Sequence, residues 1–139
     1  MGRVPSQRMA RGQCICGAVA FEFAGTLRDV VLCHCTECRR WAGHAWPATA
    51  APFDELEFSE DRGLRWIDSP DSEHDARRGF CGECGSSLFW QIPGKRTVSI
   101  AAGCLDAPTG IKTVQQIWTD SAGDYYELDE NIPSRPRGG

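Results

Sequence analysis

The cysteines of this chain fall into close groups, and their spacing constrains the fold more than any other feature of the sequence. The central group, Cys33-His34-Cys35-Thr36-Glu37-Cys38, places three thiols within a short segment. Side chains two apart on an extended backbone share a face, so Cys33 and Cys35 direct their sulfurs the same way, and Cys38 completes the group. This spacing is typical of metal ligands. The other cysteines form two further pairs and one single residue: Cys14 and Cys16, Cys81 and Cys84, and Cys104.

Length, charge and hydropathy indicate what kind of protein carries these thiols. With 139 residues the chain is expected to form one domain, of a size at which a bound metal still adds to stability. A net charge of -4 argues against a nucleic-acid or anionic-membrane partner, because phosphate binding usually leaves a basic surface. No apolar run is long enough to span a membrane, and no signal peptide is recognisable. We therefore predict a cytoplasmic protein whose reduced cysteines bind metal instead of forming disulfides.

Alternating and β-branched segments predict a mainly β fold. The clearest hairpin joins strands at Ser87–Ile92 and Thr97–Ala101. A single helical turn is expected from Thr36 to Arg40, ended by Gly43. Further strands are expected at residues 18–23, 45–50, 64–67 and 114–118.

The domain limits follow from composition. A polar, arginine-bearing N-terminal arm, residues 1–11, is expected to be flexible. A flexible C-terminal tail, rich in proline, arginine and glycine, is expected at residues 134–139. The zinc-binding domain is therefore predicted to span residues 12–133.

The thiols divide naturally into two zinc sites. A structural zinc takes four ligands, and joining the two flanking pairs supplies them without splitting any group: Cys14, Cys16, Cys81 and Cys84. The central group then binds a second zinc with three thiols and leaves its fourth position open to water or a substrate thiol, as in a catalytic site. The chain can also close that position and make the second site structural, with Cys104, His34 or His44 as the fourth ligand. His34 is the weakest of these, since it points away from its ligating neighbours and is expected to face solvent or lie behind the ligands.

An open thiolate-zinc site favours thiol chemistry. Zinc keeps a bound thiol as its anion, and that sulfur attacks an aldehyde to give a hemithioacetal, or the reverse reaction breaks the carbon–sulfur bond. Arg39 and Arg40 are expected to bind a carboxylate of the thiol substrate, or else to form an ordinary solvated pair. His44 is a further candidate for contact with metal or substrate. Trp41 and Trp46 either wall the site or pack in the core.

Glycines accompany the cysteine groups at fixed positions. The pattern runs Gly12-x-Cys14-x-Cys16-Gly17-x-Val19, Cys33-His34-Cys35-x-x-Cys38-Arg39, Gly43, Phe80-Cys81-x-x-Cys84-Gly85 and Gly103-x-Leu105-Asp106. It resembles the glutathione-dependent formaldehyde-activating family, which includes centromere protein V-like proteins. The resemblance implies an Mss4-like fold of twisted antiparallel sheets, a structural zinc on the flanking pairs and a catalytic zinc on the central group. It also implies the activity of an S-(hydroxymethyl)glutathione synthase, a carbon–sulfur lyase that uses glutathione and formaldehyde.

We therefore predict a zinc-dependent carbon–sulfur lyase that acts on a thiol adduct of formaldehyde or another small electrophile. In this enzyme Cys33, Cys35 and Cys38 bind the catalytic zinc. One alternative is a non-catalytic zinc-binding interaction module, which a closed second site would favour. Another is a thiol-responsive zinc protein, in which the central group exchanges its metal on mild oxidation.

Overall fold

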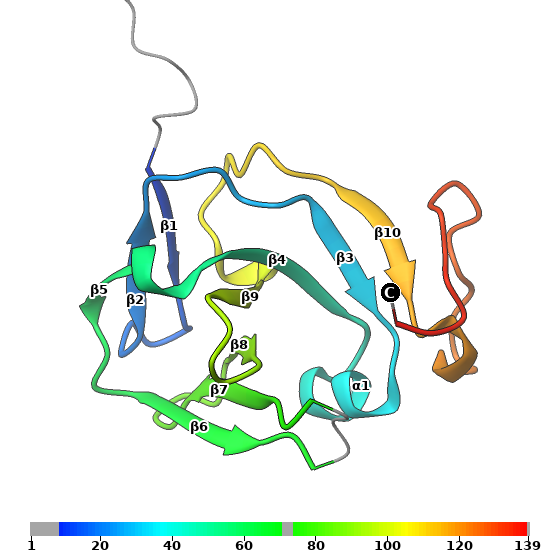
Figure 1. The fold of residues 1–139 in the computed structure, drawn as a ribbon, viewed down its shortest axis with the longest axis horizontal. Coiled ribbons are helices and arrows are strands. Elements are labelled where there is room, and N and C mark those ends of the chain that lie inside the picture. Colours follow the sequence, from blue (N-terminus) through cyan, green and yellow to red (C-terminus); the bar gives the residue numbers. More distant parts are fainter. Residues whose placement is uncertain (1–8, 71–73, 139) are drawn as a thin grey trace, which may run out of the picture.

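The computed structural model describes residues 9–70 and 74–138, and it shows the mainly β fold that the sequence predicts. The helix α1 (Thr36–Ala42) follows β3 in the chain and lies at its end (Figure 1). Three single-turn helices are η2 (Phe53–Glu55), η3 (Ala102–Cys104) and η4 (Thr119–Ser121). The strands are β1 (Ala10–Gln13), β2 (Ala20–Phe23), β3 (Val30–Cys33), β4 (Trp46–Pro52), β5 (Glu57–Glu60), β6 (Leu64–Asp68), β7 (Arg77–Cys81), β8 (Ser87–Gln91), β9 (Thr97–Ala101) and β10 (Thr113–Ile117).

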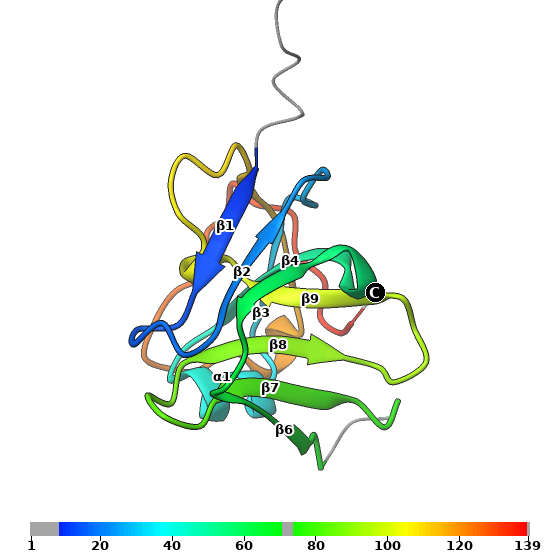
Figure 2. The same ribbon diagram turned by 90° about the vertical axis from the view of Figure 1, so that its left-hand side faces the viewer.

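The strands form two sheets. A small antiparallel sheet has the order β1-β2-β5, and a larger one has the order β10-β3-β4-β9-β8-β7-β6. The small sheet lies across one end of the larger, with β6, β7 and β8 beneath it in Figure 2. Neighbouring strands are antiparallel except for β10 and β3, which run parallel. The larger sheet is therefore mixed, whereas the family resemblance implied antiparallel sheets.

Aromatic side chains fill the space between the two sheets. Phe21 of β2 contacts Phe89 of β8 with ring centroids 5.5 Å apart, and Phe58 of β5 lies 6.0 Å from Phe89. Burying each such ring stabilises the fold by about 1.5–3 kcal/mol. Cys14 and Cys81 belong to the same buried cluster. The core therefore fixes the two turns that carry the flanking cysteine pairs.

The helix α1 is capped at its start by a cysteine of the central group, Cys35, and at its end by Gly43. The Cys35 sulfur caps its first turn by accepting a hydrogen bond from the Cys38 N–H at 3.3 Å, where Thr36 was expected to be the cap. Gly43 ends the helix with a φ of 84°, and its N–H donates to the Arg39 carbonyl at 2.7 Å. Only glycine adopts this left-handed conformation without strain, so the predicted stop is confirmed.

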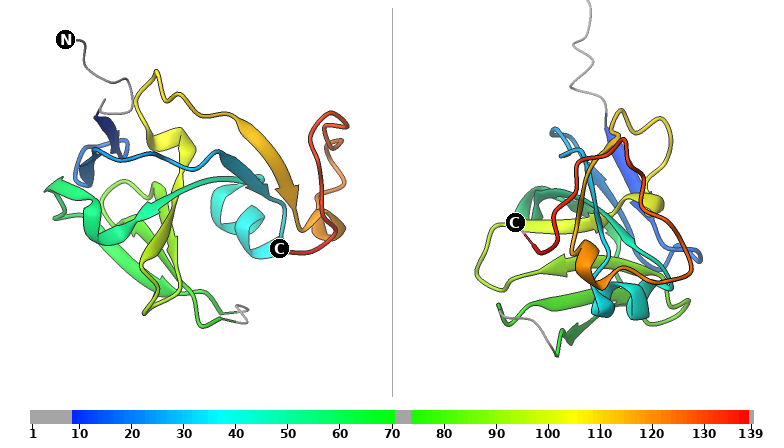
Figure 3. Two further views of the ribbon diagram at one scale, coloured as in Figure 1. Left: turned by 45° about the horizontal axis from the view of Figure 1, so that its top comes forward. Right: turned by 90° about the vertical axis from the view of Figure 1, so that its right-hand side faces the viewer.

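The C-terminal segment of the described chain packs beside β10 (Figure 3). The N–H of Gln116 donates to the carbonyl of Pro133, and the N–H of Arg135 donates to the carbonyl of Gln116, both at 2.9 Å. The Trp118 N–H reaches the Arg137 carbonyl at 3.4 Å. These bonds join residues 133–137 to the sheet, including most of the segment expected to be a flexible tail. The domain limits stay a prediction, and most of the N-terminal arm lies outside the described residues.

Four strands were missing from the expected set: β1, β3, β5 and β7. β1 overlaps the predicted N-terminal arm, β3 ends at the first cysteine of the central group, and β7 leads into the second flanking pair. β1 and β5 are each four residues long, too short for alternation to distinguish them from a turn. No helix in the described part of the chain has the length and apolarity needed to cross a membrane.

Candidate metal centres

The flanking cysteine pairs come together as one group of four, as their spacing predicts. Their sulfurs all lie within 4.8 Å of one another: Cys14, Cys16, Cys81 and Cys84. Measured separations are 3.7 Å from Cys14 to Cys16 and 3.8 Å from Cys16 to Cys81. Tetrahedral zinc with Zn–S bonds of about 2.3 Å places its sulfurs about 3.8 Å apart. All of these cysteines are free thiols, so the donor set fits a zinc ion and not a disulfide.

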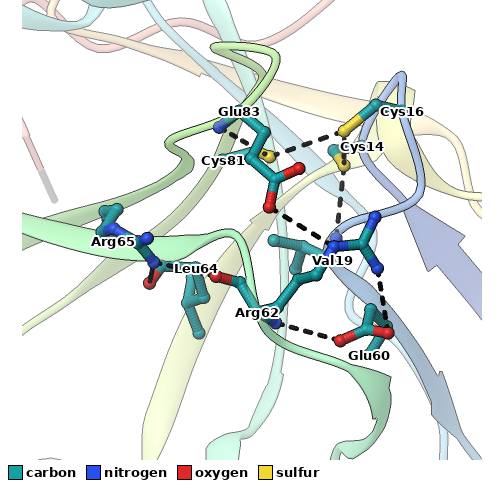
Figure 4. Close-up of polar contacts among 9 residues, drawn as sticks. All are labelled: Cys14, Cys16, Val19, Glu60, Arg62, Leu64, Arg65, Cys81 and Glu83. Atoms are coloured by element: carbon teal, nitrogen blue, oxygen red, sulfur yellow. Dashed lines mark hydrogen bonds and ion pairs between the residues drawn. The ribbon is translucent and has the colours of Figure 1, made fainter.

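Backbone donors surround this four-cysteine site. The Val19 N–H donates to the Cys14 sulfur at 3.3 Å, and the Glu83 N–H donates to the Cys81 sulfur at 3.4 Å (Figure 4). Such bonds favour the thiolate that a metal requires. At the rim, exposed Arg62 forms ion pairs with Glu60 at 3.0 Å and Glu83 at 3.4 Å. The site is thus prepared for a cation mainly by the backbone of its two turns.

The central cysteines form a second group of three. Cys33 ends β3, Cys35 caps α1, and Cys38 lies in the first turn of that helix. Their sulfurs also lie within 4.8 Å of one another. Among the described residues, no further cysteine, histidine or carboxylate joins this group. The three-cysteine site therefore has the donor set of a zinc with one position not supplied by the chain.

Hydrogen bonds among the three sulfurs set their protonation. Bonds from Cys33 and then Cys38 lower the pKa of Cys35 to about 2, and the charge of Arg78 acts in the same direction. Bonds to Cys35 and Cys38, together with burial, raise the pKa of Cys33 far above its usual value. A bond from Cys33 lowers the pKa of Cys38, but Cys35 and burial outweigh it and raise that pKa to about 11. These shifts favour the thiolate at Cys35 over those at Cys33 and Cys38, and a bound cation would favour ionisation of all three.

Arg78 of β7 is the cation closest to this site. Its side chain is only 4% exposed, and its Nη1 and Nη2 atoms lie 3.6 and 3.7 Å from the Cys38 sulfur. Nη2 also donates to Glu37 Oε1 at 3.1 Å, and Nε donates to Ser69 Oγ at 3.0 Å. The guanidinium lies 4.9 Å from the centroid of the Trp41 ring. Arg78 is therefore fixed on several sides with its charge against a sulfur of the site.

The three-cysteine site opens on a cavity of about 750 Å³. Cys33, Cys35 and Cys38 all line it, and Arg28 and Arg78 are the arginines of its wall. This volume lies within the range of small-molecule binding sites. The four-cysteine site has no place on this wall.

Cys104 lies apart from both groups. With Cys14 it lines a smaller cavity of about 450 Å³, and burial raises its pKa to about 12. Cys104 is half-buried and packs against the core cluster that includes Cys14, and its sulfur is not among those of the three-cysteine site.

His34 is buried and hydrogen-bonded, so of the two positions expected for it, facing solvent or lying behind the ligands, the solvent-facing one is excluded. It is 2% exposed, with Nδ1 2.6 Å from Tyr126 Oη and Nε2 3.0 Å from Gln116 Oε1. Gln116 uses its amide N–H on the Asp129 carbonyl at 3.1 Å, and Tyr126 Oη accepts from the Gly123 N–H at 3.1 Å. The network therefore requires neutral His34 protonated on Nε2, and burial lowers its pKa accordingly. Both ring nitrogens are engaged, which leaves none for a metal.

The three residues expected to contact substrate do not line the cavity. The Nε of Arg39 donates to the Ser121 carbonyl at 3.0 Å, so this side chain ties α1 to the C-terminal segment. His44 is exposed, with Nδ1 2.7 Å from Tyr125 Oη, and Arg40 is exposed on the outer face of α1. Substrate binding by Arg39, Arg40 and His44 stays a prediction that this arrangement does not favour.

Two cavity residues were not found from the sequence. The signal for Arg78 was present, because Arg77-Arg78 stands on a strand just before a ligand pair, and neighbouring strand residues face opposite ways. Arg28 gave no such signal. It donates from Nη2 to the Ala48 carbonyl at 2.9 Å, a contact that depends on how β3 and β4 pair.

Comparison with known proteins agrees with this geometry. A profile of the family described as glutathione-dependent formaldehyde-activating enzyme matches residues 9–121. Curated proteins offer no match to the chain. Among solved structures, the chain is similar to the crystal structure of a Rhodobacter sphaeroides protein, with 23% identity, a TM-score of 0.57, and coverage of 75% of this chain and 99% of that one; this likeness bears on the fold alone. Because the profile spans most of the sequence and both cysteine groups, the chain belongs to the glutathione-dependent formaldehyde-activating enzyme family.

Proposed function

We propose that this protein is a zinc-dependent carbon–sulfur lyase, similar to S-(hydroxymethyl)glutathione synthase. Its substrate would be a glutathione-type thiol adduct of formaldehyde or another small electrophile. One observation carries the proposal: Cys33, Cys35 and Cys38 line the larger cavity as a group of three. A structural zinc takes four protein ligands, whereas a catalytic zinc keeps a position for substrate. A second, structural zinc would be bound by the four-cysteine site.

The residues of the chain have distinct tasks in this reaction. Cys33, Cys35 and Cys38 would hold the catalytic ion, which supplies a Lewis acid that keeps a thiol ionised at neutral pH. The cavity encloses the adduct, and Arg28 and Arg78 offer positive charge to its carboxylates. In the cleavage direction the carbon–sulfur bond breaks with its electron pair on sulfur, and the hydroxyl group loses its proton as the carbonyl forms. The reaction needs no oxidant or reductant. A reducing, cytoplasmic location is proposed with it, because free thiols at these distances would otherwise oxidise.

Serine substitutions at the two sites test the division of roles. Cys35→Ser is expected to abolish turnover and reduce zinc from two ions per chain to about one, with the fold intact. Cys81→Ser is expected to unfold the domain, because structural zinc supplies folding free energy directly. Zinc content, circular dichroism and release of formaldehyde from S-(hydroxymethyl)glutathione are the measurements. Equal damage to folding by both substitutions would mean that the two sites do not differ in role.

Zinc content with and without glutathione separates this proposal from the other functions. Two zinc ions, of which glutathione perturbs one, are expected for the lyase. A second zinc that ignores thiols and supports no turnover would indicate a non-catalytic interaction module. Release of one zinc by mild oxidation, without saturable turnover, would indicate a thiol-responsive protein.

A further inference from the structure

The tryptophans of this chain gather around the three-cysteine site. The sequence contains five, and four of them pack against the buried cluster that includes Cys33 and Cys38: Trp41, Trp46, Trp90 and Trp118. Three line the cavity itself, namely Trp46, Trp90 and Trp118. Tryptophan is a scarce residue, and the fifth, Trp66, packs against Phe89 in the core between the sheets. The cavity therefore has an aromatic wall where the reacting sulfur would lie.

Strand pairing places one of these indoles directly beside Cys33, since Trp46 is the partner of Cys33 on β4. On the other side, Ile117 is the partner of Cys33 on β10, and Trp118 follows it in the chain. Trp46 and Trp118 both line the cavity with Cys33, so a group attached to a sulfur at this site shares the cavity with two indoles.

The backbone at Trp118 is strained. Its φ is 57°, a left-handed conformation that is uncommon for any residue with a bulky side chain. Such a conformation is unfavourable and persists where surrounding structure enforces it, commonly at ligand-binding sites. Here the Trp118 N–H bonds to the Arg137 carbonyl, and Gly138 lies so close that a Cβ there would stand 2.6 Å from the indole Nε1. The C-terminal segment therefore fixes this tryptophan on the cavity wall.

One cation of the cavity, Arg28, lies away from this aromatic part along the strands. Arg28 donates to the Ala48 carbonyl, and Ala48 is the partner of Val31, two residues before Cys33. Two residues along a strand span about 7 Å. A carboxylate of a thiol such as glutathione can reach Arg28 along β3 while its sulfur stays at Cys33. The indoles are then left for the other half of the adduct.

We infer that the electrophile half of the substrate carries an aromatic ring, so that the adduct is the hemithioacetal of an arylaldehyde or a close relative. This inference rests on the proposed lyase function. A formaldehyde adduct adds only one carbon and one oxygen to the sulfur, which cannot cover two indoles. An aryl group buries its apolar surface against them and prefers tilted ring packing. Cleavage of this adduct breaks the carbon–sulfur bond with its electron pair on sulfur, releases the hydroxyl proton to solvent and yields an arylaldehyde and a thiolate.

The test compares two stable thioethers that cannot undergo cleavage. S-benzylglutathione and S-methylglutathione share the thiol half and differ only in the group on sulfur. Isothermal titration of the zinc-loaded full chain is expected to show at least about tenfold tighter binding of S-benzylglutathione. Equal affinity, tighter binding of S-methylglutathione, or no binding of the benzyl compound at millimolar concentration would overturn the inference.

Tryptophan variants locate the preference. Trp118→Leu is expected to remove most of the benzyl preference, measured as the ratio of the two affinities, and Trp90→Leu provides a second, independent variant. Trp66→Leu is the matched control, because Trp66 lies in the core and not on the cavity, and it should keep the full preference. A preference that survives both cavity substitutions would place the aryl group elsewhere and contradict the inference.

Kinetics separates this inference from the proposed function. If the benzyl preference is found but neither benzaldehyde nor formaldehyde adducts of glutathione are turned over, the lyase proposal fails and the aromatic site stands. If formaldehyde adducts are turned over with no benzyl preference, the lyase stands and the aromatic substrate is wrong.

Discussion

At the scale of single residues, the neighbouring arginines of β7, Arg77 and Arg78, contact different parts of the protein. Arg78 places its guanidinium against the Cys38 sulfur, whereas Arg77 bonds to Gln91 and lies 3.8 Å from the Trp66 ring centroid. A zinc ion with three thiolates has a net charge of about -1, and a thiolate substrate makes it more negative. Arg78 is the cation in position to offset that charge, shared with the carboxylate of Glu37.

We expect Arg78→Gln to weaken zinc binding by the three-cysteine site about tenfold or more, because a hydrogen bond to a charged group contributes about 1.5–3 kcal/mol. Arg78→Lys is expected to have a zinc affinity between those of the unchanged protein and Arg78→Gln, since lysine keeps the charge but not the planar set of donors. Competition with a chromophoric chelator measures the affinity. Arg77→Gln removes a neighbouring guanidinium from the other face and is the control. The same zinc affinity in both glutamine variants would show that Arg78 does not support the metal.

The cysteine metal ligands were easier to predict than the residues that surround them. The cysteine ligands could be predicted from the sequence because metal-ligand spacing is local and the grouped thiols divide into four and three, with only Cys104 left single. Arg78 and Arg28 reach the site through strand pairing, which no short motif encodes. His34 was misplaced because alternation alone puts it opposite its ligating neighbours, and here that opposite face is covered by Gln116 and Tyr126.

At the scale of elements, the three-cysteine site depends on β10 and the segment that follows it. β10 runs parallel to β3. Pro133 and Arg135, which follow β10 in the chain, form backbone hydrogen bonds with Gln116 of β10. The side chains of His34, Gln116 and Tyr126 join these parts through a network in which each polar group has a partner. Fully paired buried networks of this kind rigidify the elements they connect.

We expect Tyr126→Phe to lower the free energy of unfolding by about 1–3 kcal/mol, because it leaves the buried Nδ1 of His34 without its donor. Urea denaturation of the zinc-loaded protein at neutral pH measures the change. Tyr125→Phe is the matched control, since Tyr125 is 60% exposed and bonds to exposed His44, and its effect should stay within about 0.5 kcal/mol. Equal effects of the two substitutions would mean that the His34 network adds no stability.

The elements themselves were predicted unevenly. The hairpin of β8 and β9 and the helix stop at Gly43 could be read locally, from alternation around a turn and from a glycine that takes a positive φ. The parallel pairing of β10 with β3 could not, because it depends on a long connection between distant segments.

At the scale of the whole molecule, the two metal sites occupy different surroundings. Cys14 and Cys81 belong to the aromatic core that joins the sheets, whereas the three-cysteine site lines the larger cavity. Loss of metal from the first would leave buried thiolates at the centre of the fold. Loss of metal from the three-cysteine site would leave Cys33, Cys35 and Cys38 as thiols on the wall of the larger cavity.

We therefore expect a chelator to remove zinc in two phases. The first should release about one ion per chain with no change in circular dichroism, and the second should release the other together with cooperative unfolding. Zinc release followed by a metal-sensitive dye, alongside far-ultraviolet dichroism, measures both. The Cys35→Ser variant should lack the first phase. Release of all metal in a single step with unfolding would show that the two sites are coupled.

The position of β10 at the edge of the larger sheet also fixes an order of assembly on the ribosome. All four cysteines of the four-cysteine site precede Trp118, Tyr126 and residues 133–137 in the chain. A nascent chain would therefore be able to bind a metal at that site and form its aromatic core while the larger cavity still lacks part of its wall. For the proposed lyase, activity would be added last, by residues that contribute no metal ligand.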